Sequence, residues 1–180
     1  MSGRSPDFPV SVLIDADRLA SRIAVLASEI IGDMGREFLV ISVLKGSFVF
    51  AADLLRALHL AGGTPDMDFI TLSSYGAGTK STGEVTVSRD LDVEIAGRQI
   101  LIVDDILESG RTLSFAKDLM LSRQARSVKT CVLLEKPGKL AVSMKADFVG
   151  FECPDKFVVG YGMDAAHAWR QLPFVGVMEE

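Results

Sequence analysis

The sequence predicts an α/β fold with a mostly parallel central sheet flanked by helices. Short apolar runs rich in branched residues alternate along the chain with longer segments whose apolar residues recur every three or four positions. Such alternation of strands and helices is typical of parallel sheets with helical crossovers. Hydrophobic residues make up 48% of the 180 residues, which excludes wholesale disorder. The mean hydropathy of +0.30 is high for a soluble chain of this size, which favours strands buried on both faces.

The expected elements, in chain order, are a helix over 16–34, a strand over 38–44, a helix over 47–61, strands over 67–72, 85–87 and 99–104, a helix over 112–124, and strands over 128–134, 147–151 and 157–161. Asp15 or Asp17 is placed to cap the start of the first helix, and Gly35 its end. Ser47 is placed to cap the start of the second helix.

Charge and cysteine content narrow the class of protein. Lys and Arg number 19 against 24 Asp and Glu, a net charge of −5, so no nucleic-acid partner is expected. The amino terminus lacks an apolar signal stretch, and no apolar run approaches the ~18 residues of a membrane span, so we expect a cytoplasmic protein with no membrane partner. Cys131 and Cys153 form no CxxC motif. Two buried thiols are favoured over a disulfide.

The segment 73–84, SSYGAGTKSTGE, holds three glycines and almost no apolar side chains. A loop of ~12 residues in a compact domain is usually functional or disordered. We interpret this one as a mobile lid with glycine hinges.

The main chemical signal is the segment 100–113, ILIVDDILESGRTL. An apolar strand ends at Asp104 and Asp105, and a small polar turn leads into a helix. Backbone N–H groups at a helix start form an anion site suited to phosphate, and Asp104 and Asp105 are placed to hold a hydroxylated sugar or Mg²⁺. Taken alone, the pattern also fits solvated acids followed by an ordinary N-cap. The turn residues are Ser109, Gly110, Arg111 and Thr112.

Three other motifs fit less well. A P-loop needs GxxxxGK[ST], whereas the segment 78–81, GTKS, has the wrong order and no strand directly before it. The segment 160–165, GYGMDA, hints at a dinucleotide fingerprint, but too little chain follows for a βαβ unit of ~30 residues. The triplet 103–105 looks like the opening of a phosphorelay receiver domain, yet it comes past mid-chain.

At the segment 100–113 the chain resembles the phosphoribosyltransferase family, whose signature is a strand, two acids, two apolar residues, an acid, Thr or Ser, Gly, a variable residue and Thr. Four further segments resemble the hypoxanthine (hypoxanthine-guanine) branch of this family. They are residues 44–47, 74–75, 134–137 and 154–164. The resemblance implies a type I phosphoribosyltransferase-like single domain over 1–180. It also implies a small hood of N- and C-terminal segments, including about 152–180, and a mobile lid over about 73–90.

The resemblance also implies roles for individual residues. The turn 109–112 would bind the 5′-phosphate of phosphoribosyl pyrophosphate, while Asp104 and Asp105 would face the ribose hydroxyls and Mg²⁺. Glu108 stands where the family normally has an aspartate that acts as general base near purine N7, so it adds one methylene to the reach of the carboxylate.

The purine would be recognised by Lys136, which donates to a 6-oxo group, by Phe157, which stacks on the base, and by the backbone of Val158. Pyrophosphate would contact Lys45 and Gly46. The remaining implied contacts are Asp164 to a metal ion, Arg170 to pyrophosphate, and Ser74 and Tyr75 in the lid. The residues alone also allow other roles. Phe157 fits a core residue equally well, and the charged residues fit ordinary surface groups.

The resemblance implies a purine salvage transferase that converts hypoxanthine, and guanine, with phosphoribosyl pyrophosphate to IMP or GMP plus pyrophosphate. Its cofactor would be Mg²⁺, its partners small-molecule substrates, and its assembly a homodimer or homotetramer. One alternative is a phosphoribosyltransferase that prefers guanine or xanthine. The other is a regulatory protein that senses phosphoribosyl pyrophosphate, which the acidic composition and single-domain length argue against.

Overall fold

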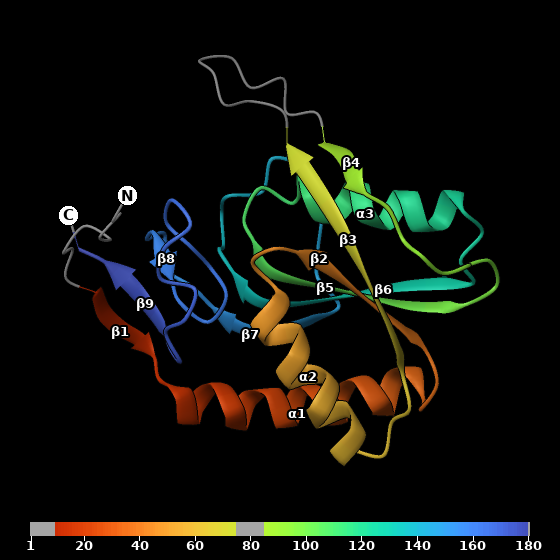
Figure 1. Ribbon diagram of the computed structural model, residues 1–180, viewed down its shortest axis with the longest axis horizontal. Coiled ribbons are helices and arrows are strands. Elements are labelled where there is room, and N and C mark those ends of the chain that lie inside the picture. The colour runs from red at the N-terminus through yellow and green to blue at the C-terminus, as the bar shows by residue number, and fades with distance from the viewer. Residues whose placement is uncertain (1–9, 75–84, 180) are drawn as a thin grey trace, which may run out of the picture.

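The computed structural model describes residues 10–74 and 85–179, and its centre is a six-stranded sheet (Figure 1). The strands, in spatial order, are β4 (Val85–Arg89), β3 (Asp66–Ser74), β2 (Leu39–Leu44), β5 (Gln99–Leu107), β6 (Ser127–Glu135) and β7 (Phe148–Glu152). β4 runs antiparallel to β3, and every other neighbouring pair is parallel. The expectation of a mostly parallel sheet is therefore confirmed.

Helices cover both faces of this sheet. α1 (Ala16–Met34) and α2 (Phe48–Leu60) lie on one face, and α3 (Arg111–Ser122) lies on the other (Figure 1). Successive residues of β5 alternate between the two cores: Leu101 packs on the α1 and α2 side, and Ile102 on the α3 side. Strands buried on both faces explain why apolar runs, rather than alternation, mark them in the sequence.

The predicted capping interactions are found at α1, whereas the side chain predicted to cap α2 bonds elsewhere. The Asp15 side chain caps α1 by accepting a hydrogen bond from the Arg18 N–H (2.8 Å), and Gly35 ends α1 with a φ of 81°. Ser47 precedes α2, but its hydroxyl makes no capping bond. That hydroxyl instead donates to the Val43 carbonyl oxygen and lies 2.7 Å from Ser42 Oγ in β2. Ser47 therefore occupies the predicted N-cap position, and its carbonyl oxygen accepts from the Ala51 N–H (2.8 Å), but its side chain does not cap the helix.

The strand β5 is longer than predicted. The sequence predicts that Asp104 and Asp105 end the strand, but β5 continues to Leu107. Pairing with β6 persists beyond the acids, with Ile106 opposite Leu134. The neighbouring strand thus overrides the local polarity, and both acids lie within the strand.

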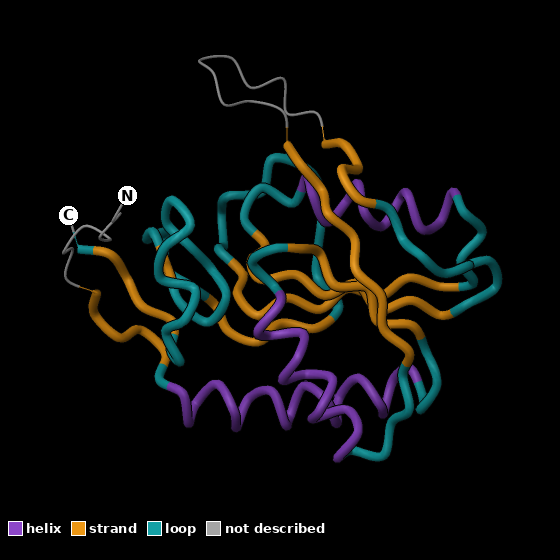
Figure 2. The backbone as a smooth tube through the Cα atoms, viewed as in Figure 1, coloured by secondary structure: helices purple, strands orange, loops and turns teal. Residues whose placement is uncertain are grey.

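A second, three-stranded antiparallel sheet lies to one side of the first (Figure 2). It consists of β1 (Val10–Ile14), β9 (Val175–Met178) and β8 (Val158–Val159). β1 and β9 were not expected as strands, because such short segments carry little periodicity and these two come from opposite ends of the chain. The expected strand over 157–161 shrinks to two residues, since Tyr161 adopts a φ of 50°.

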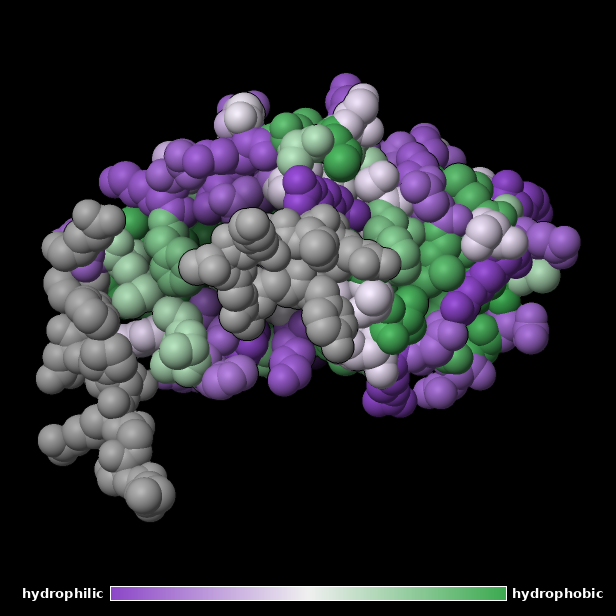
Figure 3. All heavy atoms as spheres, turned by 90° about the horizontal axis from the view of Figure 1, so that it is seen from above, coloured by the Kyte–Doolittle hydropathy of each residue, from purple (hydrophilic) through white to green (hydrophobic). Residues whose placement is uncertain are grey.

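Seen from above, hydrophobic residues reach the surface in patches between hydrophilic ones (Figure 3). Within residues 10–74 and 85–179, no helix has both the length and the apolar character needed to cross a bilayer.

Candidate active site

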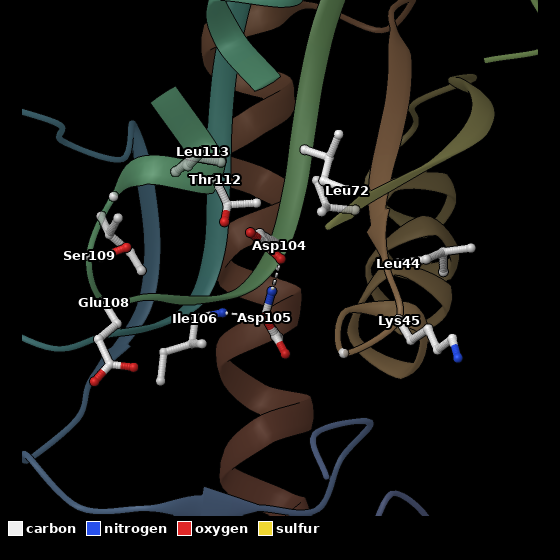
Figure 4. Close-up of a pocket in the computed structure, with 14 residues that line it drawn as sticks. Leu44, Lys45, Leu72, Asp104, Asp105, Ile106, Glu108, Ser109, Thr112 and Leu113 are labelled. Carbon is white, nitrogen blue, oxygen red and sulfur yellow. Dashed lines mark hydrogen bonds between the residues drawn. The ribbon is translucent and has the colours of Figure 1, made fainter. Parts of the chain in front are cut away.

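A cavity of about 270 Å³ opens at the carboxyl ends of β2 and β5 (Figure 4). Its walls come from the turn after β2, the end of β5 and the start of α3. Ligands bind at this edge of parallel α/β sheets because the connecting loops diverge there. The sequence-predicted residues that line it are Lys45, Gly46, Asp104, Asp105, Glu108, Ser109, Gly110 and Thr112.

The turn before α3 is built as an anion site. Gly110 adopts a left-handed conformation with a φ of 77°, and α3 begins at the next residue. The N–H groups in the first turn of a helix have no intrahelical acceptor, and the helix dipole makes that end positive. The side chain of Arg111 is exposed and does not line the cavity. The turn therefore offers amides, together with the hydroxyls of Ser109 and Thr112, to an anion.

The loop after β6 supports this turn from outside the cavity. The Ala141 N–H donates to the Ser109 carbonyl oxygen (2.9 Å). A Cβ at Gly110 would lie 3.0 Å from Met144 and 3.1 Å from Leu140, so the space beside Gly110 is already filled. A glycine is thus required at position 110 both for its backbone conformation and for this close packing.

Asp104 and Asp105 form an acidic pair at the floor of the cavity. Burial raises the pKa of Asp104 well above its ordinary value, and the negative charge of Asp105 raises it further. Burial also raises the pKa of Asp105, although a hydrogen bond from the Ile106 N–H (2.8 Å) and the positive charge of Arg170 oppose that shift. A sugar hydroxyl or a cation binding here would relieve the cost of holding the two carboxylates together.

The turn after β2 reaches the acidic pair through its backbone. The Leu44–Lys45 peptide bond is cis. A Cβ at Gly46 would overlap the Asp105 carboxylate, so any side chain at this position would require that carboxylate to move. The Lys45 side chain is exposed and points away from the acidic pair (Figure 4). Backbone groups of this turn, rather than the lysine, lie nearest to the acids.

Glu108 and Lys136 form an ion pair, with Lys136 Nζ 3.3 Å from Glu108 Oε1. The Lys136 side chain is 8% exposed, whereas the Glu108 side chain is 47% exposed. Lys136 follows β6, and its N–H donates to the Leu107 carbonyl oxygen (2.9 Å), which ties it to the end of β5. A cation and a carboxylate from adjacent strand ends are thus held together next to the anion turn.

The second sheet supplies an aromatic surface. The Phe157 side chain is largely solvent-exposed (the residue is 58% exposed), so the alternative that it belongs to the core is wrong. Its carbonyl oxygen accepts a hydrogen bond from the Met178 N–H (3.1 Å), which fixes its backbone. Val158 is buried and pairs with Val177. An exposed aromatic ring on a rigid backbone suits stacking on a planar ligand.

The segment 160–170 brings a third set of charges to the site. Arg170 forms an ion pair with Asp164 (2.6 Å) and donates to the Gly162 carbonyl oxygen (2.6 Å). A Cβ at Gly162 would overlap the Gly46 carbonyl oxygen, so this segment contacts the turn after β2. Sequence reasoning missed that contact, although the glycines of the GYG triplet at 160–162 are its visible signal.

Two parts of the predicted site remain unplaced or dispersed. Ser74 ends β3, and Tyr75 with the rest of 75–84 lies outside the described residues.

In the described part of the chain, no three His, Cys, Asp or Glu side chains come close enough to hold a metal ion by themselves. Mg²⁺ in phosphate sites typically takes one or two carboxylates and completes its shell with substrate oxygens and water. The donor set therefore fits a Mg²⁺ ion that binds together with a phosphorylated substrate.

Residues 11–166 match the family model of the phosphoribosyl transferase domain. The chain belongs to the phosphoribosyltransferase family. It is 44% identical over 169 residues to the hypoxanthine-guanine phosphoribosyltransferase of Bacillus subtilis, a match that covers 93% of this chain and 92% of that one. The type I phosphoribosyltransferase fold expected from the sequence is confirmed.

Other members of the phosphoribosyltransferase family show the same likeness. The bifunctional protein TilS/HprT of Listeria innocua is 46% identical over 169 residues, but the match, 93% of this chain, spans only 26% of that longer protein. Among solved structures, a hypoxanthine-guanine phosphoribosyltransferase of Bacillus anthracis superposes with a TM-score of 0.88 and 42% identity, over 96% of this chain and 100% of that one.

Proposed function

We propose that the protein is a purine salvage transferase. It converts hypoxanthine, and guanine, with phosphoribosyl pyrophosphate to IMP or GMP plus pyrophosphate. The observation that carries the proposal is the Glu108–Lys136 ion pair, 3.3 Å between Nζ and Oε1, beside the anion turn before α3. A phosphate site alone fits many proteins, whereas an adjoining carboxylate and buried ammonium suit a 6-oxopurine.

In this proposal the turn 109–112 binds the 5′-phosphate of phosphoribosyl pyrophosphate with its amides and hydroxyls. Asp104 and Asp105 accept hydrogen bonds from the ribose hydroxyls. Positive charge that develops on the ribose at C1′ is stabilised by these carboxylates, which are already in place before the reaction. The anomeric carbon C1′ then lies between the turn 109–112, which binds the 5′-phosphate, and the residues that bind the purine.

The purine lies against Phe157, and its edge meets the backbone of Val158. Lys136 donates a hydrogen bond to the 6-oxo group, which favours hypoxanthine and guanine over adenine because the 6-amino group of adenine is itself a donor. Purine N9 attacks C1′ as pyrophosphate leaves, and Glu108 accepts the proton from N7. The exposed position of Glu108 lets the purine edge reach its carboxylate.

Pyrophosphate lies between the turn containing Lys45 and Gly46 and the segment that carries Asp164 and Arg170. A Mg²⁺ ion would take one or two of the carboxylates of Asp104, Asp105 and Asp164, with substrate oxygens completing its shell, and would neutralise the charge on the leaving pyrophosphate. The contact between Gly46 and Gly162 supports this placement, because it brings the two pyrophosphate-binding segments together.

Several wider features belong to the same proposal. Residues 1–180 form one domain, with a small hood that is made of N- and C-terminal segments and includes about 152–180. Of the lid expected over about 73–90, residues 75–84 lie outside the described residues, and Val85–Arg89 form β4, which pairs with β3, so the expected bounds of the lid are too wide. The free thiols of Cys131 and Cys153, both buried, suit a reducing compartment such as the cytoplasm. The exposed apolar side chains of Phe48 and Leu60 on α2 support assembly into a homodimer or homotetramer.

The test is steady-state kinetics with phosphoribosyl pyrophosphate and Mg²⁺ and each of four purines: hypoxanthine, guanine, xanthine and adenine. We expect turnover of hypoxanthine and guanine, and a kcat/KM for adenine at least ~10³-fold lower, as for a site whose buried donor finds no acceptor. Absence of turnover with every purine, alongside tight binding of phosphoribosyl pyrophosphate, would favour the sensor alternative.

A further inference from the structure

We propose that Tyr161 and Asp53 form a positioning pair that keeps the two pyrophosphate-binding segments in register. These segments are the turn 44–47 after β2 and the segment 160–170. The inference rests on the proposed function, because it assigns the purpose of the pair to the pyrophosphate half of that site. Neither residue lines the cavity at the anion turn, so the pair acts through its neighbours.

The pair joins the segment 160–170 to α2. Tyr161 donates a hydrogen bond from its hydroxyl to Asp53 Oδ2, across 108 residues of sequence. Asp53 lies in α2, the helix that begins directly after the turn 44–47. Tyr161 is buried and packs in the core formed with α1 and α2. A part-buried hydroxyl that bonds a carboxylate is a directional link, and it is stronger than a hydrogen bond between neutral groups.

The backbone at Tyr161 is held in a conformation that most residues avoid. Its φ is 50°, between two glycines that also have positive φ values, 91° at Gly160 and 101° at Gly162. The Tyr161 N–H donates to the Leu172 carbonyl oxygen (2.9 Å), and the Gly162 N–H to the Arg170 carbonyl oxygen (3.1 Å). A non-glycine residue keeps such a conformation only when its surroundings determine it, and the bond to Asp53 is one of those constraints.

That conformation places the two segments in direct contact. A Cβ at Gly162 would overlap the Gly46 carbonyl oxygen, so the segment 160–170 rests on the turn 44–47 without any side chain between them. The Gly162 carbonyl oxygen in turn accepts from Arg170 (2.6 Å), whose other nitrogen binds Asp164. A shift of Tyr161 would therefore move Gly162, and with it Arg170, which is assigned to pyrophosphate, and Asp164, which is assigned to Mg²⁺.

The chemistry of the pair suits a permanent link. Burial, aided by the hydrogen bond to Asp53, raises the pKa of Tyr161, so its hydroxyl remains a donor throughout the neutral range. Arg56 also contacts Asp53, but its side chain is 72% exposed, so this ion pair contributes little to the geometry. Arg56 therefore supplies a matched control that removes a contact of Asp53 and leaves the Tyr161 bond intact.

The experiment measures the dissociation constant of pyrophosphate in the presence of Mg²⁺ by calorimetry, and the KM values for phosphoribosyl pyrophosphate and hypoxanthine. Tyr161→Phe keeps the ring and removes the donor. We expect it to raise the pyrophosphate dissociation constant and the KM for phosphoribosyl pyrophosphate about tenfold, the size of a hydrogen bond to a charged group. The KM for hypoxanthine should stay within about twofold, because the purine contacts lie elsewhere.

Variants of Asp53, the partner of Tyr161, ensure that the test does not depend on a single substitution. Asp53→Ala should match Tyr161→Phe, the double variant should be no worse than either single variant, and Asp53→Asn should recover most of the affinity because it retains an acceptor. Arg56→Ala should change none of the constants. Additive effects of the two single variants, equal changes for both substrates, or unchanged pyrophosphate binding would each overturn the inference. Turnover by the unmodified protein tests the proposed function separately.

Discussion

Lys136 Nζ lies 3.3 Å from Glu108 Oε1, and this pair joins the ends of two neighbouring strands. The lysine is buried and its partner is partly exposed, so the pair is asymmetric. A buried ammonium must keep a partner, because an unpaired buried charge is costly. An incoming 6-oxopurine would offer a second acceptor to Lys136 while Glu108 turns to the N7 proton. The pair thus explains how the site is stable before substrate binds.

Replacement of Glu108 tests its role as general base. Glu108→Gln retains size and hydrogen bonding but cannot accept a proton, and Glu108→Ala removes the group altogether. Both should lower kcat about 10²–10⁴-fold, the usual contribution of a general base, with only a modest change in nucleotide affinity. Steady-state turnover and IMP binding measure the two quantities, and Glu152→Gln, an exposed change in β7, is the control. Unchanged turnover would remove Glu108 from the role.

Replacement of Lys136 tests purine selectivity. Lys136→Met keeps most of the apolar stem and removes the donor, so discrimination between hypoxanthine and adenine should shrink by at least about tenfold, through loss of kcat/KM for hypoxanthine. Lys139→Met is a matched control, because Lys139 forms an ion pair with Asp155 (2.7 Å) in which neither side chain is buried. Equal loss for both purines would show that Lys136 does not read the 6-position.

The close approach of Gly46 to Asp105 allows a test of whether the backbone position of the turn 44–47 matters for activity. Gly46→Ala would force its Cβ into the Asp105 carboxylate, and displacement of about 1 Å in such a site costs about 10²-fold in kcat/KM for phosphoribosyl pyrophosphate. Gly32→Ala in α1 is the control, because no atom lies within 4 Å of a Cβ there. Gly32→Ala should be neutral or stabilise the protein by up to ~1 kcal/mol. Full activity of Gly46→Ala would contradict the described packing.

The acidic pair predicts a pH dependence of stability in Mg²⁺-free protein. Burial raises the pKa of Asp104, so the folded protein binds its proton more tightly than the unfolded chain does. The free energy of unfolding therefore falls as pH rises from the ordinary aspartate value of 3.8 through the raised folded value. Asp104→Asn should lessen this decline and raise Tm at neutral pH, by about 2–4 °C for each kcal/mol, while weakening substrate binding. A smaller decline should remain, because burial also raises the pKa of Asp105.

Calorimetry of both proteins in EDTA across the acidic and neutral range measures this effect. Asp90→Asn serves as the comparison, because the hydrogen bond from Arg123 lowers the pKa of Asp90, so that loss of its charge should not raise Tm. An Asp104→Asn protein less stable than the parent at neutral pH would show that the acidic pair carries no such cost.

The sequence predicts the main sheet and the turn before α3, because both depend on local signals. The apolar run before Asp104 specifies a buried strand by composition, and Gly110 marks the turn by its backbone freedom. Asp15 was identified as one of two possible caps, and the structure selects it.

Features that depend on contacts between residues far apart in the chain could not be predicted from the sequence. β5 continues past its two acids because β6 pairs with it. The hydroxyl of Ser47, the N-cap residue of α2, bonds Ser42 in β2 instead of a backbone N–H of the helix. β1 pairs only with β9, from the opposite end of the chain, and β9 pairs with both β1 and β8. The contact between Gly46 and Gly162 likewise joins segments more than a hundred residues apart, and no periodicity reports it.

A crystal structure of the protein with bound IMP tests the central claim most directly. The 5′-phosphate should lie on the amides of residues 109–112 at the start of α3, with the ribose hydroxyls on Asp104 and Asp105 and the purine between Lys136 and Phe157. A phosphate found away from that turn, with the amides of residues 109–112 bound only to water, would contradict the proposed site and the chemistry assigned to it.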